Sequence, residues 1–441
     1  MKKIIVLGAG RSSGSLIKYL LTHSHIDDFE VTVADISVSS AQEKIHKHPR
    51  GRAIAFDINN AEQRIKEISA ADIVISLLPP ALHYLAAVDC VQAGKHLVTA
   101  SYVSPELKSL NDEAVNKNIL LLNECGLDPG IDHLSAMEII HRLQEKGAEL
   151  KCFKSFTGGL VAPESNDNLW GYKFTWNPRN VILAGQGTAR YIERNHYKYI
   201  PYNRLFTEIE KITVNDLGTF DGYANRDSLA YRKIYSIDTI PTLMRGTLRQ
   251  QNFCSAWQVF VSLGLTDDTY IVEDSEHLTY VQLIESFIPV SAKGKTTEER
   301  LCDFLDLETG GIEMEMIRST GILYDTIIGL PSATPAQILQ HLLQSKWVLK
   351  PDDKDMIVMQ HSFKYSLDGK DETLQSSLVV KGESVEQTAM AKTVGLPLGI
   401  VTRLILKNKI SLRGIHIPVQ KEIYEPVLNE LKEYGICFIE Q

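Results

Sequence analysis

A glycine-rich turn near the start of the chain constrains the possible folds more than any other feature of the sequence. The apolar run 4–7 leads into the turn 8–14 (GAGRSSG), and an amphipathic stretch over 12–22 follows. Glycines between a strand and a helix let the backbone approach a pyrophosphate, and the N–H groups at the helix N-terminus bind its charge. Gly8, Gly10 and Gly14 follow a GxGxxxG spacing, one residue longer than the usual motif, so the turn predicts a nucleotide site only in a suitable context.

Asp35 supplies part of that context. The stretch 30–35 is predicted to form a second strand, and its last residue is a carboxylate about 20 residues after Gly14, the usual place of the acid that binds the ribose of a dinucleotide. An ordinary strand, turn and helix with a solvated aspartate would need no ligand. The order of strand, glycine turn, helix and acid favours the dinucleotide site over that alternative.

The charge and cysteine content of the chain exclude several classes of function. A chain of 441 residues is expected to form two or three domains. Because its net charge is −9, it is expected to bind neither nucleic acid nor an anionic membrane. An anionic substrate would therefore need local arginines. Six scattered cysteines without a CxxC pair argue against a metal site and a disulfide framework, and indicate a cytoplasmic protein. No run of 18 apolar residues occurs, so no transmembrane helix is expected.

The apolar pattern predicts two kinds of domain. Alternating short apolar runs and amphipathic stretches over 1–125 are typical of an α/β Rossmann domain, a parallel sheet covered by helices on both faces. From about residue 150, longer alternating runs predict a second α+β domain with a mixed sheet, over 126–384. Near the end, a helix over 386–407 is predicted to break at 395–397 (GLP), and a last helix covers 422–434. The predicted strands of the first domain are 3–8, 30–35, 52–57, 72–78, 96–100 and 119–123, and its helices lie near 12–22, 39–47, 60–69, 81–93 and 105–117.

Segment 126–133 (GLDPGIDH) follows the sixth predicted strand and concentrates groups that could carry chemistry. Ligands bind beyond the carboxyl ends of parallel strands, so this segment, 76–80 and 101–102 are expected to converge on one crevice. Asp132 is best explained as the N-cap of a helix, whereas Asp128 has no such local role. His133 would be the first helical residue, and either a core or solvated histidine or a proton carrier fits that position.

Two arginines are candidates for binding a carboxylate. Arg226 lies in 223–228 (YANRDS) and Arg245 in 243–249 (LMRGTLR), both flanked by glycine or polar residues. A guanidinium offers the fixed fork of donors that two-point binding of a carboxylate requires, although an arginine by itself is usually a surface residue. Lys173 and Trp176 could either contact a cofactor or simply cover the boundary between two domains.

At these segments the chain resembles the saccharopine dehydrogenase family, specifically its glutamate-forming type, also called saccharopine reductase. The resemblance runs from end to end, and several motifs in the same order are more specific than any glycine turn. Besides the turn, the matching motifs are 74–79 (VISLLP), 99–102 (TASY), 126–133 (GLDPGIDH), 157–160 (TGGL), 162–164 (APE), 173–176 (KFTW), 225–228 (NRDS) and 245–249 (RGTLR).

The resemblance implies the fold, the cofactor and the site residues. It implies that the segment 385–441 packs back on the cofactor domain. It implies that saccharopine, a tricarboxylate amino acid, is held by Ser101, Tyr102, Asp128, Arg226, Arg245, Gly246 and Thr247. Together with Gly8 of the turn, the implied cofactor-binding residues are Gly10, Arg11, Ser12, Ser13, Asp35, Asp57, Ser76, Leu127, Asp128, Pro129 and Trp176.

The cofactor is predicted to be NAD rather than NADP. Fungal relatives that use NADP carry a Cys-Arg pair after the second strand, whereas this chain has Asp35-Ile36-Ser37. A carboxylate there binds a free 2′-hydroxyl and repels a 2′-phosphate. Arg11, in the glycine turn, leaves NADP open because its guanidinium could meet that phosphate.

The reaction implied by the resemblance is a reversible hydride transfer between the nicotinamide and the secondary amine of saccharopine, in lysine metabolism. An imine would form and then hydrolyse to L-glutamate and 2-aminoadipate 6-semialdehyde, with Asp128 or His133 as the candidate general base. The alternatives are a related imine reductase such as carboxynorspermidine dehydrogenase, and a nucleotide sensor without turnover. A homodimer is the default expectation for a symmetric assembly. The physiological direction of the reaction stays open.

Overall fold

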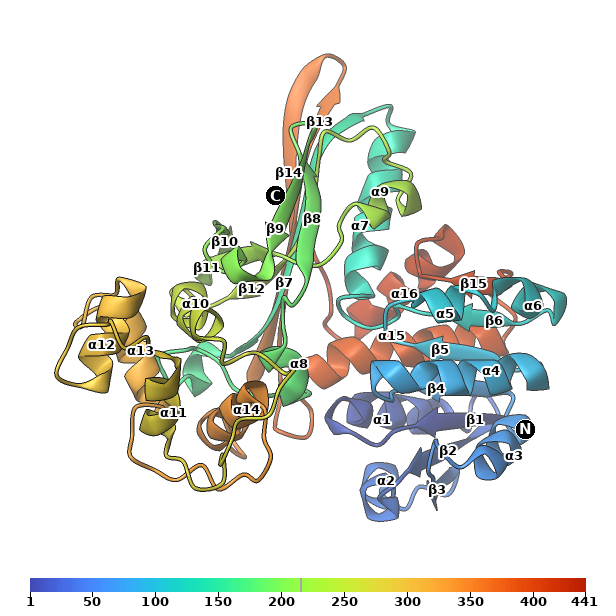
Figure 1. The fold of residues 1–441 in the computed structure, drawn as a ribbon. Coiled ribbons are helices and arrows are strands. Elements are labelled where there is room, and N and C mark those ends of the chain that lie inside the picture. The colour runs from blue at the N-terminus through green and yellow to red at the C-terminus, as the bar shows by residue number, and fades with distance from the viewer. Residues whose placement is uncertain (215) are drawn as a thin grey trace. The chain divides into compact units, whose positions relative to one another are not determined.

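The computed structural model describes residues 1–214 and 216–441. Within them the chain forms two compact units (Figure 1). The first comprises 1–149, 366–372 and 378–441, and the second comprises 150–365 and 373–377. Three separate stretches of sequence therefore build the first unit.

A seven-stranded parallel sheet forms the centre of the first unit, and its order is β15-β6-β5-β4-β1-β2-β3. Strands β4 and β6 are buried along their whole length, as expected for a parallel sheet that is covered on both faces. The predicted Rossmann fold is thereby confirmed. The strands are β1 (Lys2–Leu7), β2 (Phe29–Asp35), β3 (Gly51–Ala55), β4 (Ile73–Ser76), β5 (His96–Thr99), β6 (Leu120–Leu122) and β15 (Gly414–His416).

Helices alternate with these strands, and three of them begin at a polar side-chain cap. The side chains of Ser37, Asn60 and Ser104 each accept a backbone N–H of the first helical turn, which ends the preceding loop and starts the helix. The predicted helix 105–117 is divided in two, and Ser109 Oγ at the division donates to the carbonyl of Glu106. The helices are η1 (Arg11–Ser13), α1 (Gly14–His23), α2 (Val38–Ile45), α3 (Ala61–Ala70), η2 (Pro80–Leu82), α4 (His83–Ala93), α5 (Pro105–Lys108) and α6 (Asn111–Asn116).

The C-terminal stretch completes the first unit. It contributes β15, which pairs with β6, and the helices α15 (Ala389–Leu406) and α16 (Lys421–Glu433), followed by β16 (Ile439–Glu440). Helix α7 (Ile131–Glu145) packs against α16 and therefore groups with this unit, whereas the sequence-based division assigned 126–384 to the second domain.

Helix α15 runs without interruption through Pro397, so the predicted break at 395–397 is wrong. Its small residues explain the difference, because Gly395 and Gly399 lie directly against Leu16 and Tyr19 of α1. The packing gained along this buried face outweighs the hydrogen bond that proline removes. In the described part of the chain, α15 is also the one helix long and apolar enough to cross a membrane, with a mean hydropathy of 1.4, but 67% of it is buried and it packs as a core helix.

The second unit is built around a mixed sheet, which confirms the predicted α+β class. The order of this sheet is β10-β11-β12-β7-β13-β14-β16, with β8 paired to β12 and β9 to β8. Strands β12 and β7 run parallel, whereas β11 runs antiparallel to both of its neighbours, β10 and β12. The strands are β7 (Glu149–Val161), β8 (Thr188–Glu193), β9 (His196–Pro201), β10 (Ile209–Val214), β11 (Gly218–Ala224), β12 (Thr242–Arg249), β13 (Asp355–Leu367) and β14 (Lys370–Lys381).

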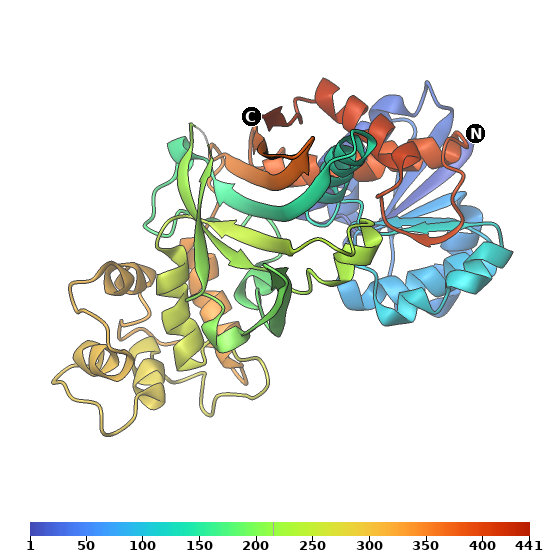
Figure 2. The same cartoon turned by 90° about the horizontal axis from the view of Figure 1, so that it is seen from above.

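The helices within 253–346 gather on one side of this sheet, as the yellow and orange segments show (Figure 2). Their core contains the stacked rings of Trp170 and Phe260, with centroids 5.6 Å apart, and of Phe253 and Trp257, 5.5 Å apart. The helices are η3 (Pro163–Ser165), α8 (Pro178–Ile182), η4 (Tyr202–Arg204), α9 (Ala230–Ile234), α10 (Phe253–Leu263), α11 (Tyr280–Phe287), α12 (Thr297–Leu305), α13 (Ile312–Thr320) and α14 (Pro335–Lys346).

We predict that Gly395→Ala destabilises the protein by about 1–3 kcal/mol, the usual cost of overpacking a core. A Cβ at this position would lie 2.6 Å from the backbone nitrogen of Leu16, which cannot move without distorting α1. Gly310→Ala is the matched control, since a Cβ there meets no atom within 4 Å. Urea unfolding of both variants checks the prediction, and equal stabilities would contradict it.

Candidate functional site

The glycine turn takes a backbone conformation that suits a bound phosphate. Gly8 has a φ of 105°, and a Cβ there would lie 3.2 Å from the carbonyl oxygen of Leu77, so glycine is required. Ser13 donates to the carbonyl of Gly10 from both its N–H (3.1 Å) and its Oγ (2.8 Å), which leads the chain through η1 into α1. A Cβ built at Gly10 meets no atom within 4 Å, so the backbone of the turn is open at this position, as the close approach of a pyrophosphate requires.

Asp35 is held in place by backbone donors at the end of β2. Its carboxylate accepts the N–H of Ala9, within the glycine turn, at 2.7 Å and the N–H of Ser37 at 2.9 Å. Each oxygen keeps a lone pair for a further donor, so the position fits the ribose hydroxyls of a dinucleotide. Asp57 lies exposed after the neighbouring strand β3 and accepts the N–H of Asn59 at 2.9 Å.

The parallel pairing brings several predicted residues to one edge of the sheet. Leu7, just before the turn, is in register with Ser76 at the end of β4, and Ser76 is in register with Thr99 at the end of β5. Ser101 and Tyr102 follow β5 and are half-buried. Arg11 is exposed and Ser12 half-buried on the turn itself. This edge therefore gathers the implied cofactor residues of the first unit.

His83 joins two of these residues, and sequence reasoning did not single it out. Its Nδ1 lies 2.8 Å from Ser76 Oγ and its Nε2 lies 2.7 Å from Ser101 Oγ. The ring is 2% exposed, and burial lowers the pKa of His83 to about 4. The sequence shows only that this histidine lies near the start of a predicted helix after 76–80. That position does not indicate that Ser76 and Ser101 are its hydrogen-bond partners.

The loop 126–130 closes on itself before α7. The N–H of Gly126 donates to the carbonyl of Pro129 at 2.9 Å, and the peptide between Asp128 and Pro129 is cis. Every other residue of this loop is buried, Leu127 included, whereas Asp128 is half-buried. The loop therefore leaves one carboxylate partly accessible.

The remaining acid of this segment does not act as predicted. The N-cap of α7 is Gly130, and Asp132 lies inside the first turn, where its Oδ1 accepts the N–H of Gly130 at 2.6 Å. The predicted N-cap at Asp132, with His133 as the first helical residue, is therefore wrong, because the helix begins two residues earlier, at Ile131.

His133 is fully buried between two carboxylates. Its Nε2 lies 2.9 Å from Glu124 Oε2, and its Nδ1 lies 3.6 Å from Asp132 Oδ2. Glu124 also accepts the N–H of Val103 at 3.2 Å, so His133 ties α7 to the turn after β5. Of the interpretations that the sequence left open, this burial favours a core histidine over a proton carrier.

The two arginine motifs come together in the second unit. Strands β11 and β12 pair so that Ala224 is opposite Gly246, and the N–H of Asn225 donates to the carbonyl of Arg245 at 2.8 Å. Arg226 follows directly with a φ of 48° and is exposed, whereas Arg245 is buried with its guanidinium 4.3 Å from the centre of the Tyr231 ring.

Gly246 and Trp176 are fixed by their surroundings in the second unit. A Cβ at Gly246 would lie 2.7 Å from the carbonyl oxygen of Tyr223 and would overlap the ring of Phe156, so the close strand pairing requires glycine. Thr247 is opposite Tyr223 across the same pair of strands. Trp176 is half-buried, and its Nε1 donates to the hydroxyl of Tyr172 at 3.3 Å.

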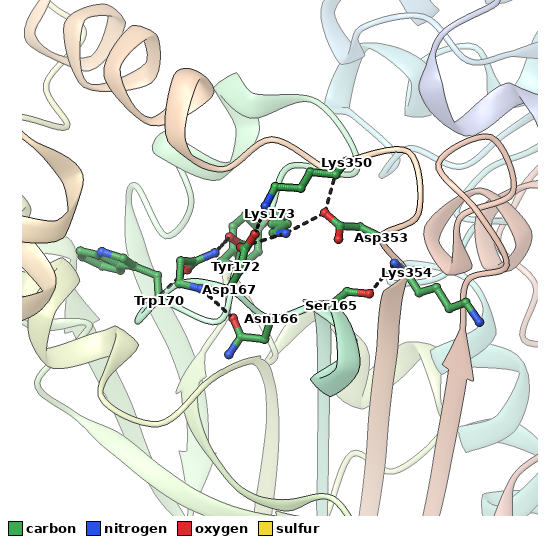
Figure 3. A network of polar contacts seen from close by, with 10 residues as sticks. Ser165, Asn166, Asp167, Trp170, Tyr172, Lys173, Lys350, Asp353 and Lys354 are labelled. Carbon is green, nitrogen blue, oxygen red and sulfur yellow. Dashed lines mark hydrogen bonds and ion pairs between the residues drawn. The ribbon is translucent and has the colours of Figure 1, made fainter.

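Lys173 is a buried cation with two acidic partners (Figure 3). Its Nζ lies 2.6 Å from Asp353 Oδ2 and 2.9 Å from Asp167 Oδ1. Lys350 reaches the other oxygen of Asp167 at 2.5 Å from the exposed side, and the hydrogen bonds from Lys350 and Lys173 lower the pKa of Asp167 to about 2. Lys173 thus joins two loops of the second unit.

Within residues 1–214 and 216–441, no three His, Cys, Asp or Glu side chains gather as a metal site would require. The cysteines all carry free thiols.

Comparison with known proteins gives the chain a family context. The family models "Saccharopine dehydrogenase NADP binding domain" and "Saccharopine dehydrogenase C-terminal domain" match residues 4–122 and 126–436. The chain is 34% identical to the mitochondrial alpha-aminoadipic semialdehyde synthase of Bos taurus, over 100% of this chain and 48% of that protein. It therefore spans about half the length of the first such relatives.

Two further matches cover nearly the whole length of both chains. The NADP(+), L-glutamate-forming saccharopine dehydrogenase of Saccharomyces cerevisiae is 32% identical over 100% of this chain and 99% of that protein. A solved structure of the apo, histidine-tagged L-Glu-forming enzyme from the same yeast matches with a TM-score of 0.89 at 31% identity, over 100% of this chain and 99% of that one. A nicotinamide cofactor-binding domain is thus present in the first unit.

We predict that Lys173→Met destabilises the protein by about 3 kcal/mol, because it leaves the charge of Asp353 without its buried partner. Lys350→Met is the matched control, since Lys350 is exposed and shares Asp167 with Lys173, and its unfolding midpoint should stay nearly unchanged. Urea unfolding measures both. If Lys173→Met instead weakened cofactor binding at unchanged stability, Lys173 would be a cofactor contact.

Proposed function

The chain belongs to the saccharopine dehydrogenase family, and we propose that it oxidises saccharopine to L-glutamate and 2-aminoadipate 6-semialdehyde with a nicotinamide cofactor, reversibly. The observation that carries the proposal is the pairing of β11 with β12, which sets the motifs around Arg226 and Arg245 next to each other. An acidic chain needs such a local concentration of positive charge to hold a substrate with three carboxylates.

The chemistry divides into hydride transfer and hydrolysis. A bound oxidised nicotinamide supplies the hydride acceptor. The hydride leaves the carbon next to the secondary amine of saccharopine, the amine loses a proton, and water adds to the resulting imine to release glutamate and the semialdehyde. The protein has to hold the substrate carboxylates and orient the amine, which we assign to Arg226, Arg245 and the hydroxyls of Ser101 and Tyr102.

Asp128 is the better candidate for the group that takes the amine proton. It is the half-buried carboxylate of the loop 126–130, whereas His133 is fully buried between Glu124 and Asp132. A general base must come within hydrogen-bond reach of the proton that it removes, directly or through one water. We therefore assign this role to Asp128 and a positioning role to His133.

For the cofactor we propose NAD(H). The Asp35 carboxylate stands at the end of β2, held by the N–H groups of Ala9 and Ser37, where a 2′-phosphate would meet a negative charge. The yeast relative is named for NADP(+), and the exposed guanidinium of Arg11 is the group that would favour it here. The expected homodimer, the cytoplasmic location and the absence of nucleic-acid or membrane partners stay predictions.

An assay of the wild-type chain with saccharopine tests the proposed activity. We expect reduced nicotinamide to accumulate, and at equal concentrations NAD should be reduced faster than NADP because of the charge of Asp35. The absorbance of the reduced cofactor is measured, with glutamate detected as the second product. No turnover of saccharopine with either cofactor would refute the activity, and a clear preference for NADP would refute only the cofactor assignment.

Arg226→Ala tests the carboxylate clamp. Loss of a charged hydrogen bond costs about 1.5–3 kcal/mol, so the KM for saccharopine should rise at least about tenfold while cofactor affinity stays unchanged. Arg204→Ala is the control, since Arg204 is an exposed arginine of the same unit that pairs with Glu208. An unchanged KM for Arg226→Ala would remove Arg226 from the substrate site.

A further inference from the structure

A buried histidine connects a residue implied in cofactor binding with one implied in substrate binding. His83, the first residue of α4, lies between Ser76 at the end of β4 and Ser101 just after β5. Both contacts are short, 2.8 Å and 2.7 Å, and they use the two different nitrogens of the ring. The three side chains therefore form one continuous chain of hydrogen bonds across two neighbouring strands.

The charge state of the ring determines what this chain can do. Burial lowers the pKa of His83 to about 4, so the imidazole is neutral at physiological pH. A neutral imidazole has one N–H donor and one acceptor nitrogen. One serine therefore accepts a hydrogen bond from the ring while the other donates to it, and the two hydroxyls are not equivalent.

This difference sets what each serine presents to a ligand. The serine that accepts from the ring keeps its own O–H proton to donate elsewhere, whereas the serine that donates to the ring is left with lone pairs only. A serine hydroxyl rotates freely unless something fixes it, and freezing it beforehand lowers the entropic cost of binding. A fully buried ring at the centre is suited to fixing both hydroxyls at once.

We propose that His83 is a positioning residue that sets the donor and acceptor sense of the Ser76 and Ser101 hydroxyls, for the cofactor and for saccharopine respectively. The proposal rests on the proposed function for its substrate part. Its cofactor part depends only on the nicotinamide-binding domain. A purely structural histidine would support the strand ends without distinguishing the two ligands.

Two substitutions separate the two contacts. The amide of His83→Asn can occupy the place of Nδ1 and reach Ser76, whereas that of His83→Gln can occupy the place of Nε2 and reach Ser101. We expect His83→Asn to raise the KM for saccharopine about three- to tenfold and to leave the dissociation constant of the cofactor within about twofold. For His83→Gln we expect the dissociation constant of the cofactor to rise about three- to tenfold and the KM for saccharopine to stay within about twofold. Fluorescence titration with NADH or NADPH, whichever the wild type binds more tightly, gives the dissociation constant.

A double-mutant cycle shows whether His83 acts through its serines. In a Ser101→Ala background, His83→Asn should cause no further rise in the KM for saccharopine, because the hydroxyl that it orients is gone. If both His83 variants change both constants equally, or change only the thermal midpoint, the proposal is overturned. The control is His96→Gln, since His96 accepts the N–H of Leu120 at 2.9 Å at the opposite end of β5 and should affect stability alone.

The wild-type protein provides a test that does not depend on the folding of any variant. A long-range proton–nitrogen NMR spectrum reports the tautomer of His83, and we expect one neutral tautomer at neutral pH. Averaging between the two tautomers would overturn the proposal. If the wild type fails to oxidise saccharopine, the proposed function fails, but the tautomer and the effect of His83→Gln on cofactor affinity still decide whether His83 positions Ser76.

Discussion

The parallel pairing of β1 with β2 and β4 is the constraint on which the site in the first unit depends. Parallel strands end at the same edge of a sheet, so one set of backbone hydrogen bonds brings Gly8, Asp35 and Ser76 together. The hydrogen bond from the N–H of Ala9 to Asp35 then fixes the turn against the next strand. Without this register the glycines would form an ordinary loop with no acid beside it.

The two units differ in the polar and charged groups that they hold. In the first unit the groups at the sheet edge are mostly backbone N–H groups, hydroxyls and one neutral imidazole, which suit a ligand whose charge is met by the start of a helix. In the second unit positive charge is held inside the protein. Arg245 lies against the ring of Tyr231, and Lys173 is paired with Asp353 and Asp167. A chain with a net charge of −9 thereby keeps two cations inside the second unit, one stacked on a ring and one paired with carboxylates.

The C-terminal stretch shows how close packing can override local preference. Proline inside a helix removes a hydrogen bond and usually ends it, yet α15 continues through Pro397. Gly395 and Gly399 let the helix approach α1 until backbone and ring atoms are in contact, and the buried area offsets the local cost. The same stretch adds β15 to the sheet, so residues more than 250 positions apart share one core.

Sequence alone determined the Rossmann class, the mixed second sheet, the glycine turn and the place of Asp35, because each depends on short-range periodicity or on residues about one strand and helix apart. It also identified the motifs of Arg226 and Arg245, although not that strand pairing makes them neighbours. Tertiary structure decided the links of His83 to Ser76 and Ser101, the burial of His133 between Glu124 and Asp132, and the continuity of α15. The continuity of α15 depends on packing against the distant helix α1, and the contacts of the two histidines depend on how the chain turns between strand and helix. Local periodicity encodes neither: a histidine at the start of a helix looks the same in sequence whether its ring meets water or two serines.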